Sequence, residues 1–248
     1  MKVVAIIPSR FRSTRFEGKP LARIGGKSMV QRVYEKAKQS EKITDVFVAT
    51  DDQRIVDAVL DFDGHALMTS SENKSGTDRV AEAAEKIGLV ADDIVVNIQG
   101  DQPLLDPRSI DELIGAFNAG SGFEMATLAF RTLDENEINN PKDVKVTFDF
   151  EGFALYFSRS PIPFHRDPDV RPMFYKHLGI YAYRKRFLEI FQNLPEGKLE
   201  NLEKLEQLRA IEFGHRIKVI ITKYDSPEVD FPNDIARVEK ALNQCPAL

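Results

Sequence analysis

The chain has 248 residues, a formal net charge of −5, 42% hydrophobic residues and 29% charged residues. This length is enough for one large α/β domain with a substantial core, and the composition is ordinary for a globular protein. The negative net charge argues against a general surface for nucleic acids or anionic membranes. The one cysteine, Cys245, excludes an internal disulfide, and Val3–Ile7 is too short for a signal peptide or a membrane span. We therefore expect a cytoplasmic protein without membrane insertion.

The first predicted element is a strand at Val3–Ile7, an apolar and mostly β-branched run closed by Pro8. Such a run is typical of a strand buried on both faces, as at the centre of a parallel sheet. The loop that follows is rich in hydroxyl groups and in cations, which are Arg10, Arg12, Arg15 and Lys19. Cationic side chains and loop N–H groups suit a polyphosphate ligand. The alternative is a solvated basic loop.

Strands and helices then alternate along the first half of the chain. The apolar patterns predict helices at 28–39, 53–62, 79–88 and near 108–118, and strands at 45–50, 65–69 and 94–99. Each strand leads into a polar loop, and Thr77 or Ser75 can cap the helix at 79–88. The alternation predicts a doubly wound, mostly parallel α/β sheet with ligands at the carboxyl ends of its strands. The glycine fingerprint of dinucleotide-binding proteins is absent, so that interpretation has no support.

The pattern changes after residue 124. Strands are predicted at 125–130, 144–149, 153–158, 177–183 and 217–222, and helices at 185–194, 199–213 and 233–243. Leu202, Leu205, Leu208 and Ile211 predict a buried stripe on the helix at 199–213. We expect one domain (1–248), with a core from 1–124 and 214–248 and an antiparallel extension with a lid from 125–213. The proline-rich segment at 161–174 is predicted to be mobile.

Two aspartates are candidate metal ligands. Asp101 follows a buried strand through Gly100, and Asp230 lies at a similar strand-to-helix junction. Two carboxylates at one sheet edge are a usual minimal protein ligand set for a Mg²⁺ that also binds substrate phosphates. Both could instead cap a helix or a turn.

Several other polar residues are candidates with ordinary structural alternatives. His177 and Tyr181 lie four residues apart on a predicted strand, so they share one face. His177 could simply be a hydrogen-bonded core residue, which is the commoner case for a lone histidine, and Arg159, at the end of a strand, could be a surface charge. Glu206 and Gln207 lie beside the apolar stripe of a predicted helix, where most such side chains are solvated.

These residues belong to longer segments that together resemble the 3-deoxy-manno-octulosonate cytidylyltransferases (CMP-KDO synthetases). The similar segments are IIPSRFRSTRFEGKPL, ATDD at 49–52, SGTDR at 75–79, VNIQGDQP at 96–103, MATL at 125–128, ALYFSRSPIPF at 154–164, HLGIYAY at 177–183, LEKLEQLR at 202–209 and VDFPND at 229–234. The resemblance implies a Rossmann-like, GT-A-like nucleotidyltransferase core. It also implies condensation of CTP with KDO to CMP-KDO and pyrophosphate for lipopolysaccharide biosynthesis, a Mg²⁺ requirement and a homodimer formed through 125–213.

The resemblance also implies roles for individual residues. It places the nucleotide against Pro8, Arg10, Ser13, Arg15, Lys19, Ala49, Thr50, Asp51, Ser75, Gly76, Thr77, Arg79, Gln99 and Asp101. It places the acidic sugar, in the 125–213 extension, against Gln99, Arg159, His177, Tyr181, Glu206 and Gln207. Asp101 and Asp230 would bind the metal. Arg10 and Lys19 would act with them in catalysis by offsetting charge on the pyrophosphate that leaves.

The sequence departs from the family pattern in ways that bear on the sugar. Gln102 stands where an acid is usual, Phe231 and Asn233 differ in the segment around Asp230, and the loop at 165–175 is shorter than in many members. These changes leave open the same reaction on the 8-amino analogue of KDO. A GT-A glycosyltransferase and a non-catalytic nucleotide-binding module are rival interpretations from other classes.

Overall fold

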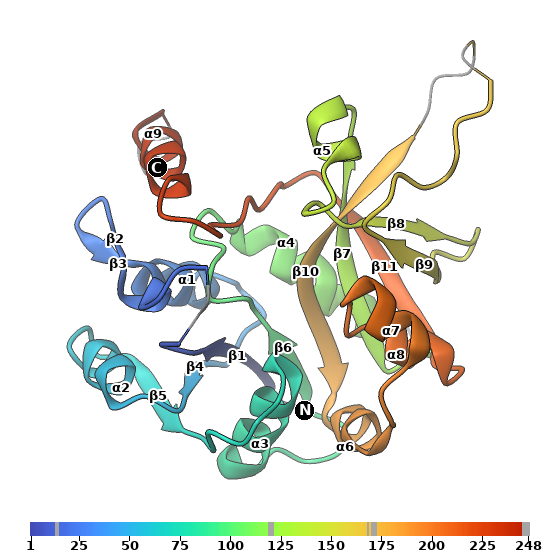
Figure 1. The fold of residues 1–248 in the computed structure, drawn as a ribbon. Helices are drawn as coiled ribbons and strands as arrows, with labels where there is room; N and C mark the ends of the chain where they lie inside the picture. The colour runs from blue at the N-terminus through green and yellow to red at the C-terminus, as the bar shows by residue number, and fades with distance from the viewer. Residues whose placement is uncertain (13–14, 119–121, 168, 170–172, 245–248) are drawn as a thin grey trace.

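The computed structural model describes residues 1–12, 15–118, 122–167, 169 and 173–244. Its principal sheet has the strand order β11-β7-β10-β6-β1-β4-β5 (Figure 1). These strands are β1 (Val3–Ser9), β4 (Asp45–Thr50), β5 (His65–Met68), β6 (Ile94–Asn97), β7 (Met125–Thr132), β10 (Phe174–Arg184) and β11 (Ile217–Thr222). A hairpin of β8 (Lys145–Phe148) and β9 (Ala154–Ser158) joins the same sheet through β10.

Most neighbouring strands run parallel. β1 pairs in parallel with β4 and β6, β4 with β5, and β7 with β11. β10 is antiparallel to both β6 and β7, and its register shifts between His177 and Tyr181. The predicted doubly wound, mostly parallel sheet is therefore confirmed, with one long antiparallel strand inserted near its middle.

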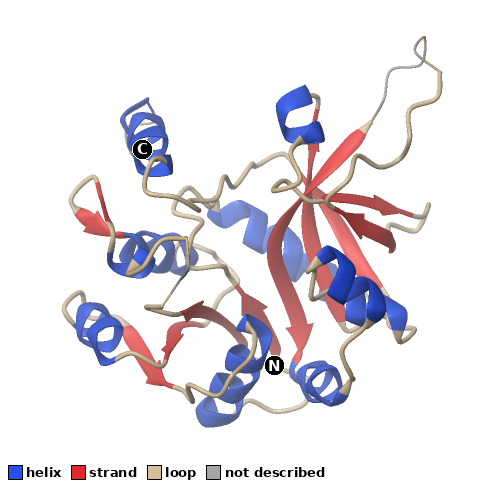
Figure 2. Cartoon of the chain, in the orientation of Figure 1, coloured by secondary structure: helices blue, strands red, loops and turns tan. Residues whose placement is uncertain are grey.

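Helices cover both faces of the sheet (Figure 2), because successive side chains of a strand point to opposite sides. Ala5 and Ile7 of β1 join one buried cluster with α1 (Met29–Lys38), α2 (Gln53–Leu60) and α4 (Pro107–Gly115). Val4 and Ile6 join the other cluster, with α3 (Gly76–Ile87), α6 (Lys185–Asn193) and α8 (Leu208–Glu212). β1 is thus buried on both faces, as its apolar run predicts.

The single helix predicted at 199–213 is wrong. The chain forms α7 (Lys198–Glu203) and α8, and Lys204 between them has a left-handed backbone with φ 53°. Leu202 is 80% exposed, whereas Leu205 and Leu208 are buried. A helical spacing of leucines cannot reveal this break, because the break is stabilised by contacts made to residues distant in the sequence. Glu206 and Gln207 consequently lie in the turn between two helices rather than on a helix face.

Some short elements were not predicted. They are β2 (Arg23–Ile24), β3 (Lys27–Ser28), α5 (Glu135–Asn139) and the 3₁₀ turn η1 (Lys19–Leu21), whereas η2 (Ala116–Asn118) forms the end of the helix predicted near 108–118. The closing helix α9 (Asp234–Gln244) packs back on the N-terminal part of the molecule, where Val229 and Val238 contact a cluster with Ile24 and Met29. No helix in the described ranges is long and apolar enough to cross a membrane. The cytoplasmic location stays a prediction.

Candidate active site

Two cavities adjoin at the carboxyl edge of the sheet. The first cavity, of about 300 Å³, is lined by Pro8, Ser9, Arg10, Arg12, Lys19, Pro20, Lys74, Ser75, Gly76, Gln99, Gly100 and Asp101. The second cavity, of about 750 Å³, is lined by residues that include Arg159, His177, Tyr181, Glu206, Gln207 and Asp230. Gln99 and Asp101 line both. A molecule in one cavity can therefore reach a molecule in the other at these two residues.

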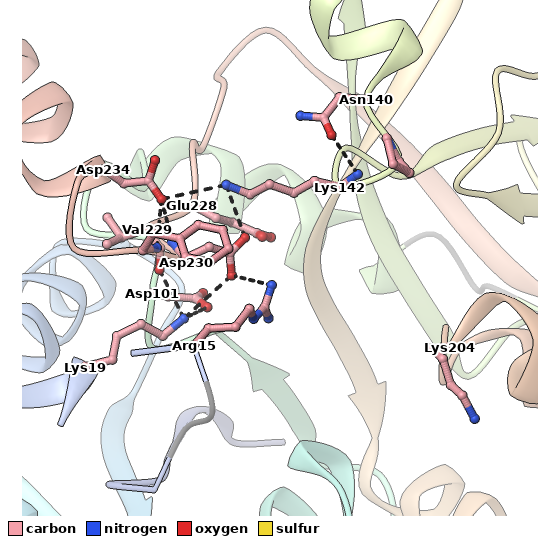
Figure 3. Close-up of polar contacts among 12 residues, drawn as sticks. Arg15, Lys19, Asp101, Asn140, Lys142, Lys204, Glu228, Val229, Asp230 and Asp234 are labelled. Carbon is pink, nitrogen blue, oxygen red and sulfur yellow. Dashed lines mark hydrogen bonds and ion pairs between the residues drawn. The ribbon is translucent and has the colours of Figure 1, made fainter. Parts of the chain in front are cut away.

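The two predicted metal ligands lie together in a cluster of acids and cations (Figure 3). Lys19 Nζ lies 2.7 Å from Asp101 Oδ2 and 4.0 Å from Asp230 Oδ1. The guanidinium of Arg15 lies 3.1 Å from Asp230 Oδ1. One ammonium group thus lies between two carboxylates that are far apart in the sequence, and the two predicted metal ligands meet at one edge of the sheet.

Backbone hydrogen bonds hold the two acidic segments in place. The N–H of Val229 donates to the carbonyl of Asp101 over 2.9 Å, which ties the segment after β11 to the loop after β6. The carboxylate of Asp234, at the start of α9, accepts from the N–H groups of Asp230 and Phe231, each at 2.9 Å. These contacts leave the side chain of Asp230 only 5% exposed and directed at the cluster.

The chemistry of the cluster fits Mg²⁺. Mg²⁺ prefers oxygen ligands and usually takes one or two carboxylates, with substrate phosphates and water completing its shell. Asp101 and Asp230 supply the carboxylates, and Asp101 Oδ1 is buried without a hydrogen-bond partner in the described chain. No group of three or more His, Cys, Asp or Glu side chains among the described residues could hold a metal by itself. Two carboxylates leave the other coordination positions of such an ion to phosphate and water oxygens.

The first cavity is built from loop cations and a helix N-terminus. Arg10 donates to the carbonyl of Ser75 over 3.2 Å and also to the carbonyl of Asn73, which fixes the approach to α3. Ser75 caps α3 by accepting from the N–H of Asp78, as predicted, and Gly76 is the first residue of the helix. Free N–H groups at a helix N-terminus, next to cations, favour a phosphate-bearing ligand.

Six residues predicted to contact the nucleotide are not among those that line this cavity: Arg15, which lines the second cavity, and Ala49, Thr50, Asp51, Thr77 and Arg79. Arg79 is fully buried, pairs with Asp51 over 3.0 Å and donates to Thr69 over 2.5 Å. Ala49 and Thr50 are also fully buried, in β4. Arg79 and Asp51 therefore connect α3 to β4 instead of lining the cavity. Ser13 lies outside the described residues.

Arg159 brings a cation to the second cavity without a carboxylate partner in the described chain. Its guanidinium donates to the carbonyls of Glu203, Pro141 and Lys204 at 2.6, 2.9 and 3.4 Å. The carbonyls of Glu203 and Lys204 are available because α7 ends there, and a helix leaves its last carbonyls without internal partners. The break in the predicted helix thus provides the acceptors that orient Arg159.

His177 is arranged as a hydrogen-bond acceptor. The hydroxyl of Thr127 donates to the carbonyl of Ile180 over 2.7 Å, so its oxygen is left to accept from His177 Nε2 at 2.9 Å. Nδ1 then carries no proton and can accept from a ligand hydroxyl. Burial lowers the pKa of His177 to about 3, so the ring is neutral near pH 7. The ring of Tyr181 lies beside it, with centroids 5.3 Å apart.

Glu206 and Gln207 also face the second cavity. Thr77, at the start of α3, donates to Glu206 Oε2 over 3.0 Å, which connects the two sides of the site. Glu206 Oε1 and Gln207 Nε2 are buried without partners in the part of the chain that the structure describes. Burial raises the pKa of Glu206. The acceptor Glu206 Oε1 and the donor Gln207 Nε2 are therefore available to bind a hydroxylated ligand.

Several charged residues that line the cavities were given no individual role from the sequence. Arg12 and Lys74 line the first cavity, and Glu228 and Lys142 line the second. The basic composition of the loop after β1 was a signal for Arg12, whereas nothing local marks the others. Lys142 Nζ lies 3.1 Å from Asp230 Oδ2. Burial, with the nearby charges of Asp101 and Asp230, raises the pKa of Glu228 to about 7.

Two cavities that meet at the carboxyl edge of a doubly wound sheet, both with cations in their lining, are typical of a nucleotide-binding enzyme of the α/β class. A family profile described as cytidylyltransferase matches residues 4–217. The chain therefore belongs to the cytidylyltransferase family.

Relatives and solved structures agree with this family. A 3-deoxy-manno-octulosonate cytidylyltransferase of Desulfosudis oleivorans is 62% identical over 98% of each chain. An 8-amino-3,8-dideoxy-manno-octulosonate cytidylyltransferase of Shewanella piezotolerans is 56% identical over 98% of this chain and 99% of its own. A solved CMP:2-keto-3-deoxy-manno-octonic acid synthetase complexed with CTP is 40% identical, with a TM-score of 0.92 over 98% of this chain and 99% of its own.

Proposed function

We propose that this chain activates 3-deoxy-manno-octulosonate with CTP, giving CMP-KDO and pyrophosphate. The observation that carries this proposal is the pair of cavities that share Gln99 and Asp101. CTP in the first cavity would present its α-phosphorus at the shared edge, and the sugar acid in the second would present its anomeric hydroxyl there. The names of the relatives support this choice of substrates.

The chemistry is an in-line displacement at phosphorus. The anomeric oxygen forms a new bond to the α-phosphorus, the bond to the pyrophosphate oxygen breaks, and the hydroxyl proton passes to water. The proposed mechanism uses no covalent nucleophile, so catalysis would consist of positioning and charge neutralisation. Arg10 and Lys19 would offset the charge that develops on pyrophosphate.

We propose that Asp101 and Asp230 hold a Mg²⁺ during the reaction. When bound, this ion would lower the pKa of the sugar hydroxyl and screen the phosphate charges. Lys19 and Arg15 neutralise the two aspartates through ion pairs and would be displaced towards the phosphates. The two aspartates would then exchange their ion pairs for the metal, and the two cations would pair with the phosphates, so no buried charge would be left uncompensated.

The second cavity has groups that match an acidic sugar. Arg159 carries a positive charge that would pair with the sugar carboxylate. His177, Glu206 and Gln207 offer two acceptors and one donor for its hydroxyls. Tyr181 would pack against the sugar ring. This arrangement distinguishes the proposal from a module that binds only the nucleotide.

Pyrophosphate release, measured with each of the four NTPs and with KDO or its 8-amino analogue, tests the proposal. Release with CTP and an octulosonate, and with no other NTP, is the expected result. A GT-A glycosyltransferase would consume a nucleotide sugar and release no pyrophosphate. Absence of release with CTP and either sugar would contradict the proposed reaction.

The same reaction on the 8-amino analogue is a second candidate. Glu228 favours it, because this carboxylate lines the sugar cavity and a protonated amine is its natural partner. We also propose a homodimer formed through the 125–213 region, where Phe150 and Leu155 of the β8–β9 hairpin are exposed. Sedimentation at micromolar concentration that gives a monomer would refute the dimer.

A further inference from the structure

Glu228 is a carboxylate of the second cavity that the proposed mechanism does not use. It lies beside Asp101 and Asp230 in the close-up but points to the side away from Lys19 (Figure 3). Its one described hydrogen bond comes from Gln102 Nε2 at 3.4 Å, and none of the described lysines or arginines forms an ion pair with it. Lys19 and Lys142 are instead engaged with Asp101 and Asp230. A carboxylate in this position lacks a strong partner.

The residues around Glu228 provide a further hydrogen-bond acceptor and leave space beside its carboxylate. Ser226, two residues earlier, lines the same cavity, is 4% exposed, and has an Oγ without a hydrogen-bond partner among the described residues. Gly179 in β10 has φ +66°, and a Cβ there would lie 3.5 Å from Glu228 Oε1. The bare backbone of Gly179 therefore leaves the carboxylate approachable from the cavity.

Gln102 fixes the direction of this carboxylate. Its buried amide nitrogen donates to the carbonyl of Leu178 over 2.5 Å and to Glu228 over 3.4 Å. An acid at position 102 would lose both donations and would set a second negative charge against Glu228. Gln102 is therefore the residue type that permits a carboxylate at 228, and the two positions work as a pair.

A protonated primary amine matches this place better than a hydroxyl does. An ammonium has three N–H donors and no acceptor, and Glu228 and Ser226 provide acceptor oxygens. In the ring form of the octulosonate, the tail that carries C8 is attached at C6, which the ring oxygen joins directly to anomeric C2. C8 can therefore reach the same edge of the cavity as C2, which the reaction requires near Asp101.

We infer that Glu228 is a specificity-determining residue that accepts an ammonium group on C8 of the sugar, so that this enzyme uses the 8-amino sugar at least as well as KDO. This inference rests on the proposed function and narrows its substrate. Gln102 acts as a positioning residue, because it acts through Glu228. A lost charge-assisted hydrogen bond lowers transition-state binding of the amine alone by about 10- to 100-fold.

The test compares Glu228→Gln with Glu196→Gln, a matched change at an exposed glutamate outside both cavities. Pyrophosphate release gives kcat/KM for each sugar with CTP, and calorimetry gives the affinity for each sugar. We expect Glu228→Gln to lower both quantities about 10- to 100-fold for the 8-amino sugar and less than about threefold for KDO. Gln102→Met should lower kcat/KM and affinity for the 8-amino sugar by a smaller factor. Glu196→Gln should leave both quantities unchanged for both sugars.

Equal loss with both sugars and a higher Mg²⁺ requirement would overturn the inference, since Glu228 would then serve the metal carboxylates. Two other results would overturn the inference but not the proposed function. In the first, Glu228→Gln leaves kcat/KM and affinity unchanged for both sugars. In the second, the wild-type chain turns over KDO but not the 8-amino sugar. If the wild-type chain releases pyrophosphate with neither sugar, the proposed function fails. The sugar affinities measured by calorimetry then test the inference by themselves. Glu228→Gln must weaken binding of the 8-amino sugar more than binding of KDO, and any other result contradicts it. Thermal unfolding and KDO turnover verify that each variant is folded.

Discussion

The two cavities differ in how the chain builds them. The first is lined by residues from Pro8 to Asp101, which stand at the ends of parallel strands and at the start of one helix. The second collects side chains from many segments, up to Arg237, and includes the turn between α7 and α8. The cavity that we propose for the nucleotide is thus built mainly by strand ends and the loops after them, whereas the cavity that we propose for the sugar depends on segments distant from one another in the sequence.

The largest expected effect is at the edge that both cavities share. Asp101→Asn keeps the shape of the side chain but removes a charge that we assign to the metal. We expect kcat to fall about 1,000-fold or more, because metal-assisted charge stabilisation contributes several kcal/mol. Steady-state pyrophosphate release at saturating Mg²⁺, CTP and sugar measures it. Full turnover by this variant would defeat the metal assignment.

Arg10→Ala should affect the first cavity alone. We expect kcat/KM for CTP to fall about 10- to 100-fold, since a cation hydrogen-bonded to phosphate is lost. The KM for the sugar should change little. Initial rates over a matrix of both substrate concentrations separate the two constants, and an equal rise in both KM values would contradict separate cavities.

Arg159→Ala is the matching change in the second cavity. We expect kcat/KM for the sugar acid to fall about 10- to 100-fold, because its carboxylate loses a charged partner. The affinity for CTP should stay close to that of the wild type. Isothermal calorimetry with CTP gives that value directly, and a large loss of CTP affinity would argue against the assignment of Arg159 to the sugar.

His177, which lines the second cavity, should make the free energy of unfolding depend on pH below about 6.5. Because burial lowers its pKa to about 3 from an ordinary 6.5, the unfolded chain binds more protons than the folded one between these values. Stability should therefore fall as pH drops from about 6.5, by at most ~1.4 kcal/mol per pH unit from this group. Denaturant unfolding at pH 7 and pH 5 should show a smaller loss for His177→Gln than for the wild type. An equal loss would sink the prediction.

The smallest effect is expected at Lys204, between α7 and α8. Its left-handed backbone, with φ 53°, disfavours a side chain with a Cβ. Lys204→Gly should stabilise the fold by about 0.5–1 kcal/mol. Urea unfolding measures this change. Lys198→Gly, in the helical part of α7, should lower stability instead, and the opposite order would mean that the break is not strained.

The sequence predicted the first cavity better than the second for a physical reason. Val3–Ile7 is apolar at every position, so a strand buried on both faces follows from a local pattern. The cations after it, and the cap at Ser75, are also local signals. Asp230 lies near Asp101, as its strand-to-helix junction suggests, and its role as a metal ligand stays a prediction.

The rest depended on contacts that no local pattern encodes. At the break, the carbonyls of Glu203 and Lys204 accept hydrogen bonds from Arg159, which lies far away in the sequence. Lys142 and Glu228 look like ordinary surface charges until the fold brings them beside Asp230. Arg79 misleads in the opposite way. It belongs to the SGTDR segment, from which a contact with the nucleotide was predicted, but its side chain is fully buried and does not line the first cavity.

The hydrogen bond from Val229 to Asp101 connects, through the backbone, the two carboxylates that we propose as metal ligands. Asp230 follows Val229 directly, whereas Asp101 belongs to the loop after β6. If the segment around Val229 opened while the sheet stayed folded, Asp230 would move away from Asp101. Activity should therefore be lost before the sheet unfolds.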